Sequence, residues 1–185
     1  MNVLGISGTP RINGNSEILL DNALAPFHEA GWEITKILMS ENMVNPCKGC
    51  DFCENTGICC IDDDMAKIYA AYRACDAVII SSPVYWRNVP AQLKAVFDRT
   101  YAAEKSGSLR NKYGGAIAVG RGNGGGQSIV LNIIYGFFLS SGVICVSGEL
   151  NGVSAVADKP GDVGNQPNRL RQSRVLGENI LRVCK

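Results

Sequence analysis

The segment VLGISGTPRINGNS, residues 3–16, decides the fold of this chain. It opens with a short apolar run, and a loop of Gly, Ser, Thr, Pro, Arg and Asn residues follows directly. A helical pattern then begins at Ser16 and continues to Ala30. A buried strand that leads through a polar loop into a helix is typical of an open α/β sheet, which binds ligands outside the carboxyl ends of its strands.

The rest of the chain repeats this alternation of strand and helix. Short apolar runs predict five strands, at residues 3–6, 34–39, 77–80, 116–119 and 143–146. Helical patterns lie between and after them, at residues 16–30, 65–74, 90–103, 127–140 and 168–183. Nearly continuous apolar strands are typical of a parallel sheet that is covered on both faces. We therefore predict a flavodoxin-like, doubly wound, five-stranded parallel sheet of order 2-1-3-4-5.

Two long irregular segments interrupt this pattern, at about residues 40–62 and 149–167. Loops of this length are uncommon in a compact domain and usually serve function. The first contains a cluster of cysteines and follows strand 2, so it can be inserted without disturbing the sheet. We expect residues 1–185 to form one domain, because neither repeats nor a second domain are visible.

Composition excludes several broad classes of function. The net charge is +1, which gives no general attraction to nucleic acid or to an anionic membrane. Apolar runs stay shorter than the ~18 residues that a membrane-spanning helix needs. The amino terminus lacks the pattern of an export signal, so we expect a reducing, cytoplasmic location and no disulfide framework.

The first loop has the composition of a phosphate site. Its hydroxyls, amides and one guanidinium, together with the amide groups that begin the helix, suit a dianionic phosphomonoester such as that of FMN. It is neither a Walker A loop nor a Gly-x-Gly-x-x-Gly turn. The alternative is a simple helix cap. The predicted phosphate-binding residues are Ser7, Thr9, Arg11, Asn13, Gly14, Asn15 and Ser16.

Two further loops follow strands 3 and 4 and are expected to meet the same ligand. Aromatic side chains in the second loop can pack against a planar ring, and its backbone amides can bond to a flavin's pyrimidine edge. Glycines in the third loop allow backbone to lie against the ring. The predicted residues are Pro83, Val84, Tyr85, Trp86, Arg87 and Asn88, followed by Gly120, Gly122, Asn123 and Gly124. Ordinary surface packing and a flexible loop are the respective alternatives.

The chain has eight cysteines, and four of them have the spacing Cys47-x2-Cys50-x2-Cys53-x5-Cys59. This compact run favours a cubane iron–sulfur cluster over zinc, which usually takes two separated pairs. Zinc, thiol chemistry or no metal at all are the alternatives. Because Cys60 adjoins Cys59, the fourth ligand is ambiguous by one residue. The other cysteines, Cys75, Cys145 and Cys184, are expected to be buried apolar residues.

The remaining polar features predict no catalytic machinery. Asp62, Asp63 and Asp64 are expected to cap the helix that begins at Met65, and His28 is expected on a helix surface. With a single histidine there is no acid–base dyad of the usual kind and no Ser-His-Asp triad. Any chemistry therefore belongs to cofactors.

Four segments together resemble the iron–sulfur flavoproteins, within the NADPH-dependent FMN reductase-like branch of the flavodoxin-like fold. They are SGTPRINGNS, SPVYWRNVPAQLKAVFDR, GRGNGGGQS and PCKGCDFCENTGICCIDDDM. The resemblance covers nearly the whole chain. It implies one FMN and one [4Fe-4S] cluster per subunit, with Cys47, Cys50, Cys53 and Cys59 as ligands. It also implies a homo-oligomer, a dimer or tetramer, in which one subunit's cluster lies near another's flavin, and a ferredoxin-like donor.

Two positions depart from the family's pattern. Arg87 stands where related proteins usually carry a small residue, and Cys60 stands where they usually carry an apolar one. The leading hypothesis is electron transfer from a protein donor through the cluster and FMN to a small oxidant such as oxygen, peroxide or a quinone. One alternative is an NAD(P)H-dependent FMN or quinone reductase with no cluster in its cysteine loop. Another is a redox- or metal-sensing binding protein.

Overall fold

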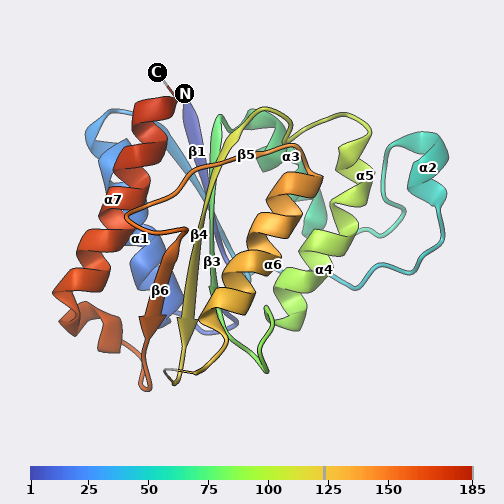
Figure 1. Ribbon diagram of the computed structural model, residues 1–185. Helices are drawn as coiled ribbons and strands as arrows, with labels where there is room; N and C mark the ends of the chain where they lie inside the picture. The colour runs from blue at the N-terminus through green and yellow to red at the C-terminus, as the bar shows by residue number, and fades with distance from the viewer. Residues whose placement is uncertain (123, 185) are drawn as a thin grey trace.

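The computed structural model describes residues 1–122 and 124–184, and it shows a parallel sheet with helices on both faces (Figure 1). The strand order β2-β1-β3-β4-β5 is the predicted one, with β6 also paired to β4. The strands are β1 (Asn2–Ser7), β2 (Glu33–Leu38), β3 (Ala77–Pro83), β4 (Tyr113–Gly120), β5 (Ile144–Cys145) and β6 (Val153–Val156). The helices are α1 (Asn15–Glu29), α2 (Phe52–Thr56), α3 (Met65–Ala74), α4 (Ala91–Arg99), α5 (Tyr101–Glu104), α6 (Gln127–Ser140), η1 (Asp162–Asn165) and α7 (Pro167–Val183).

The apolar strands are buried because each contributes side chains to both faces of the sheet. On β1, Leu4 and Ile6 belong to the core under α3, α4 and α6, whereas Val3 belongs to the core under α1 and α7. On β3, Val78 and Ile79 divide in the same way. Successive side chains of a strand point to opposite faces of the sheet, and both faces are covered here. Most positions are therefore apolar, and the strands appear in the sequence as nearly continuous apolar runs. Figure 1 shows α1 and α7 on one side of the sheet, with α3, α4 and α6 on the other.

The fifth position of the sheet differs from the prediction. The expected strand at 143–146 pairs only at Ile144 and Cys145, beside the first two residues of β4. The last four residues of β4, Ile117 to Gly120, pair instead with β6, which lies in a segment expected to be irregular. Two short strands thus share one long neighbour. The shortness of β5 also leaves Cys145 exposed rather than buried, while Cys75 is buried as expected and Cys184 is partly buried.

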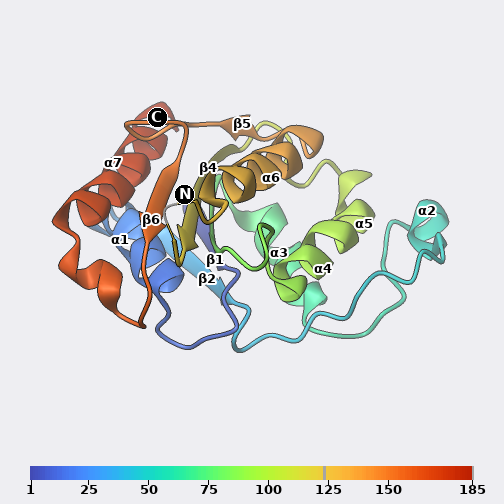
Figure 2. The same cartoon turned by 60° about the horizontal axis from the view of Figure 1, so that its bottom comes forward.

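The helices match most of the predicted patterns, with differences at residues 90–103, in the cysteine segment and at η1. The expected helix at 90–103 is divided into α4 and α5 at Thr100, whose hydroxyl donates to the carbonyl of Val96 at 2.8 Å. The cysteine segment contains the short helix α2, which the sequence pattern did not reveal. Figure 2 shows α2 beyond α4 and α5, at the opposite end of the molecule from α7.

Nothing in the described part of the chain meets the length and hydropathy that a bilayer-spanning helix requires.

Candidate functional site

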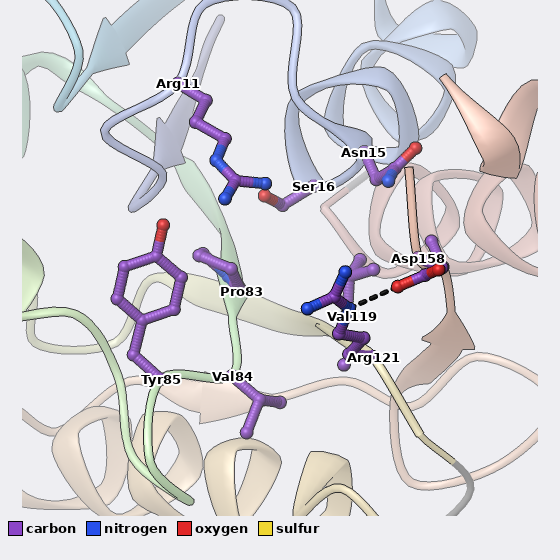
Figure 3. A pocket seen from close by; sticks show the side chains of 11 residues that line it. Arg11, Asn15, Ser16, Pro83, Val84, Tyr85, Val119, Arg121 and Asp158 are labelled. Atoms are coloured by element: carbon purple, nitrogen blue, oxygen red, sulfur yellow. Dashed lines mark hydrogen bonds and ion pairs between the residues drawn. The ribbon is translucent and has the colours of Figure 1, made fainter. Parts of the chain in front are cut away.

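A cavity of about 210 Å³ opens where the carboxyl ends of β1, β3, β4 and β6 come together. The parallel register aligns these ends, since Ser7 lies beside Ser81 and Pro83 beside Val119. Figure 3 shows its lining side chains arriving from four separate loops. They are Arg11, Asn15, Ser16, Pro83, Val84, Tyr85, Val119, Gly120, Arg121, Ala157 and Asp158.

One end of the cavity is built for an anion. The amide groups of Asn15 and Ser16 begin α1 and donate to no described residue. Arg11 reaches toward Ser16 in Figure 3 and makes no ion pair with a described residue. Free amides at a helix start carry partial positive charge, and the guanidinium adds a full one. This end of the cavity therefore offers hydrogen-bond donors and positive charge together.

Other polar residues of the first loop shape it instead of lining the cavity. The Thr9 hydroxyl accepts from the Arg11 amide at 3.2 Å, and the Glu17 carboxylate accepts from the Asn13 amide at 2.9 Å. Gly14, not Asn15 or Ser16, occupies the cap position of α1. The simple capping alternative therefore does not explain Asn15 and Ser16.

Asn15 instead ties the first loop to the segment after β6. Its Nδ2 donates to the Lys159 carbonyl at 2.7 Å, and its Oδ1 accepts from the Val163 amide at 3.2 Å. Beneath this loop the Ser7 hydroxyl is buried and has no partner among the described residues. Asn15 thus fixes the wall of the cavity that β6 supplies.

The second loop is a tight hairpin. Tyr85 and Asn88 exchange backbone hydrogen bonds of 2.8 and 3.0 Å across a two-residue turn. Trp86 and Arg87 form that turn with φ of 50° and 62°, the positive values that a type I′ turn requires. The Trp86 side chain is 100% exposed.

This hairpin limits which backbone amides are free for a ligand. We expected the amides from Val84 to Asn88 to face a flavin. The Val84 amide bonds instead to the Val119 carbonyl at 2.8 Å, and those of Tyr85 and Asn88 close the hairpin. Only the amides of Trp86 and Arg87 have no partner among the described residues.

The third loop contributes less to the cavity than expected. Gly120 lines it, whereas Gly122 is exposed and Asn123 lies outside the described residues. Gly124 and Arg87 line a neighbouring cavity of about 380 Å³ between β6 and the start of α6. At Gly120 an added Cβ would come within 2.8 Å of the Gln127 side-chain amide, so any larger residue there would have to displace Gln127.

Seven predicted flavin residues therefore line the first cavity: Arg11, Asn15, Ser16, Pro83, Val84, Tyr85 and Gly120. Four other lining residues were not predicted: Val119, Arg121, Ala157 and Asp158. Arg121 and Asp158 form an ion pair across the cavity wall (Figure 3). The strand β6, which carries Asp158 to this position, was itself missed. Its four residues, Val-Ser-Ala-Val, are mostly apolar, and this short run was the signal that the sequence offered.

The predicted cluster ligands gather in a second place, around α2. Burial raises the pKa of Cys53, and the charges of Cys59, Cys47 and Cys50 raise it further, so these thiols lie near one another. The Gly49 amide donates to the Cys47 sulfur at 3.4 Å. Cys60 also belongs to this group, with its sulfur 3.5 Å from that of Cys50. Among the described residues no three such side chains converge on a single metal ion.

A buried ion pair holds the cysteine segment against α4. Arg99 Nη1 lies 2.5 Å from Asp63 Oδ2, and their side chains are 1% and 6% exposed. Burial alone would raise the pKa of Asp63, but hydrogen bonds from Arg99 and Asn45 lower it to about 2. Asp63 also accepts from the Met65 amide at the start of α3, as expected for a capping residue. Its partner Arg99 was not predicted, because it looks like an ordinary basic residue in a last helical turn.

The donors present fit both cofactors that the sequence suggested. For FMN, the first cavity has at one end amides, a hydroxyl and a guanidinium that no described residue pairs with, and at the other end Tyr85, Pro83 and Val84. In a cubane cluster each thiolate binds a different iron atom. The four sulfurs therefore need to surround the cluster and not to converge on a single metal ion. Five thiols within fourteen residues, with N–H donors to two of their sulfurs, provide that chemistry.

Comparisons with known proteins agree with this site. The sequence model of the NADPH-dependent FMN reductase family matches residues 1–155. An iron–sulfur flavoprotein of Methanocaldococcus jannaschii is 39% identical, and the alignment covers 100% of this chain and 98% of that protein. An iron–sulfur flavoprotein of Methanosarcina thermophila is 42% identical over 79% of this chain and 77% of its own length.

Among solved structures, a flavodoxin-type WrbA-like protein of Agrobacterium tumefaciens superposes with a TM-score of 0.71. It is 16% identical, over 99% of this chain and 96% of its own, and supports the fold alone. The family match and the two iron–sulfur flavoprotein relatives, one of them aligned over the whole chain, carry the assignment further. The chain belongs to the NADPH-dependent FMN reductase family of flavodoxin-like oxidoreductases, and within it to the iron–sulfur flavoproteins.

Proposed function

We propose that this protein transfers electrons from a protein donor such as ferredoxin to a small oxidant, using FMN in the strand-end cavity and a [4Fe-4S] cluster in the cysteine segment. The observation that carries the proposal is the pairing of an anion-binding cavity at four strand ends with five gathered thiols elsewhere in the same subunit. When bound, FMN supplies two-electron redox chemistry and the cluster supplies one-electron transfer.

Within the cavity, the residues divide by chemistry. Arg11, Ser16 and the first amides of α1 would hold the flavin's phosphate. Tyr85 and Pro83 would pack against the ring, and the free amides of Trp86 and Arg87 would bond to its polar edge. No described side chain in the cavity is a histidine, and its carboxylate Asp158 is paired with Arg121. The chain's own contribution is thus binding and orientation.

The cysteine segment and the cavity are separate in one subunit. In both views α4 and α5 lie between α2 and the sheet (Figures 1 and 2). This separation supports the expectation of a homo-oligomer in which the cysteine segment of one subunit approaches the cavity of another. Sedimentation of the protein with both cofactors bound tests this expectation. A monomer in which electrons still pass from the cluster to the bound FMN would contradict it.

The cofactors are tested on protein purified without oxygen. We expect about four iron and four sulfide per chain, one FMN, and broad absorption beneath the flavin bands. A yellow protein that contains FMN but no iron or sulfide, even after reconstitution, would contradict the proposal.

The phosphate site has its own test. Arg11→Gln should weaken FMN binding by roughly 10- to 100-fold, since a hydrogen bond to a charged group contributes about 1.5–3 kcal/mol. Binding of riboflavin, which lacks the phosphate, should change little. Flavin fluorescence quenching measures both affinities. An equal loss for the two ligands would show that Arg11 does not meet the phosphate.

The second candidate is an NAD(P)H-dependent FMN or quinone reductase. The family match favours it, and a Chromohalobacter salexigens protein described as an NAD(P)H dehydrogenase (quinone) is 29% identical over 69% of this chain. Rapid anaerobic bleaching of the flavin by NADPH alone would support this candidate. Slow bleaching by NADPH, with fast bleaching by reduced ferredoxin, would support the first.

A further inference from the structure

The guanidinium of Arg99 is the most deeply buried charge that faces a cysteine sulfur. Its Nη2 lies 3.4 Å from Cys59 Sγ and 3.1 Å from the carbonyl oxygen of Ile61. Its Nη1 contacts Asp63 and, at 3.3 Å, the carbonyl oxygen of Asn45. One side chain of α4 therefore joins both ends of the cysteine segment to the body of the protein.

Asp63 completes this joint from the other side. Its Oδ2 accepts from the amide and the side chain of Asn45 at 2.9 and 3.0 Å. Its own backbone neighbour Asp64 accepts from the Met43 amide at 2.8 Å. The two ends of the segment, near residues 43–45 and 61–64, are thus held side by side. The thiols lie on the loop between them.

Cys59 and Cys60 face different surroundings although they are adjacent. Cys59 is partly buried and its sulfur accepts from Arg99. Cys60 is exposed, and its sulfur lies 3.5 Å from that of Cys50. A thiolate at position 59 would be compensated by a buried cation, whereas a thiolate at position 60 would lie in solvent beside another sulfur.

An arginine suits this position because it keeps its charge at every working pH and presents several donors in a fixed plane. Asp63 uses one edge of that plane and leaves Nη2 for the sulfur. Nε is also buried and has no partner among the described residues, so the guanidinium keeps further donor capacity. N–H donors to ligating sulfurs and nearby positive charge stabilise the more negative, reduced state of a cluster.

We propose that Arg99 is a positioning residue that directs Cys59, and not Cys60, to the cluster as its fourth ligand and raises the reduction potential of that cluster through its N–H group. The inference rests on the proposed function, because it requires that the segment hold a cluster. It goes beyond that function by assigning a residue outside the cysteine segment to the ligand choice and to the potential.

Two pairs of variants test the proposal on anaerobically purified, reconstituted protein. Cys59→Ser should lose most of its iron and sulfide, and Cys60→Ser should keep the wild-type content. Arg99→Lys keeps the charge but loses the planar pair of donors. It should hold a cluster whose potential, measured by dye-mediated titration, is more negative than that of the wild type. Lys105→Gln is the matched control, because Lys105 pairs with Glu54 in the same segment at 2.7 Å but is 45% exposed. Its potential should stay at the wild-type value, since solvent and salt screen an exposed charge.

Asp63→Asn separates a structural role from an electronic one. It disturbs the ion pair while leaving Arg99 Nη2 beside Cys59, so cluster content should fall but the potential of the remaining cluster should shift less than in Arg99→Lys. Full iron in Cys59→Ser with loss in Cys60→Ser would overturn the ligand choice. An unchanged potential in an iron-replete Arg99→Lys protein would overturn the tuning role. Absence of iron from the reconstituted wild type would instead refute the proposed function itself.

Discussion

The crossing of α1 and α7 gives a sharp test of the packing that positions the cavity. At Gly177 of α7 an added Cβ would lie 2.0 Å from the carbonyl oxygen of Ala23 in α1 and 3.0 Å from its carbon. The obstacle is backbone, so no side chain can rotate away. Since α1 also carries Asn15 and Ser16 into the cavity, any displacement of the helix reaches the ligand site.

Two opposing effects decide the result of Gly177→Ala. Replacing glycine by alanine inside a helix favours folding by about 1 kcal/mol, because alanine loses less backbone freedom. Overpacking a close contact costs typically 1–3 kcal/mol and occasionally more. An approach of 2.0 Å to a main-chain oxygen belongs at the upper end of that range. We therefore expect a net loss of about 2 kcal/mol in the free energy of unfolding.

The matched control is Gly136→Ala in α6, where an added Cβ would meet nothing within 4 Å. Here only the helix propensity acts, so stability should rise by up to about 1 kcal/mol. Urea unfolding at fixed protein and FMN concentrations measures both changes. Gly177→Ala should also bind FMN more weakly, whereas Gly136→Ala should not. A Gly177→Ala protein as stable as Gly136→Ala would refute the reasoning.

Three other outcomes are expected. The pKa of Asp63 is held at about 2, below its unfolded value of ~3.9, so its stabilisation of roughly 2.5 kcal/mol is present above about pH 4 and is lost as the pH falls through 2. Urea unfolding against pH should show this loss, and Asp63→Asn should lack it. Replacing Trp86 and Arg87 by Asn-Gly should raise the unfolding free energy by about 1–2 kcal/mol, since that pair accepts positive φ readily. FMN affinity in a fluorescence titration should stay close to the wild-type value, because the turn keeps both backbone amides. Asn15→Ala should weaken the free energy of FMN binding by more than it lowers the free energy of unfolding, because it releases the segment after β6 from the first loop. Fluorescence titration and urea unfolding measure the two changes.

The sheet could be predicted because its signals are local. Four strands are nearly continuous apolar runs, and polar or glycine-rich loops follow three of them directly. The run at 143–146 gave the right position for β5 but not its length, because the number of paired residues depends on which part of β4 is already occupied. The strand β6 has only four residues, and its half-buried pattern is too short to distinguish from a loop.

Much of the candidate site was predictable for a topological reason. Loops that follow parallel strands must meet at one edge of the sheet, so residues such as Arg11, Ser16 and Tyr85 were placed together without knowledge of their contacts. Their individual roles were less accessible. The Thr9 hydroxyl accepts a hydrogen bond within the loop, and Asn13 contributes its backbone amide to a bond with Glu17, so neither bond is visible from the residue types alone. Hydrogen-bond partners several residues away decide whether such a residue builds the loop or faces the ligand.

Arg99 is the residue near the cysteines whose role was least predictable from the sequence. In the sequence it ends an amphipathic helix with charged residues nearby, and a cation in a last helical turn is usually solvated. Its burial depends on the cysteine segment returning to α4, and that long-range contact leaves no periodic signal in the sequence. The cysteine spacing therefore predicts which atoms could bind iron but carries no information about the charge around them. The reduction potential depends on that charge, so it is set by residues that the motif does not contain.

The hairpin after β3, beside the predicted flavin site, also contains a feature that the sequence motif does not reveal. Trp86 and Arg87 both adopt positive φ, which costs each of them about 1–2 kcal/mol relative to glycine. Trp86 gains no packing in return, because it is fully exposed in the subunit. Strained backbone of this kind persists where neighbouring structure enforces it, and it concentrates at functional sites. The turn leaves the backbone amides of Trp86 and Arg87 without a partner among the described residues, and Tyr85, which precedes the turn, lines the cavity. We infer that the turn serves the ligand or a second subunit, since Trp86 is fully exposed and both backbone amides have no partner among the described residues.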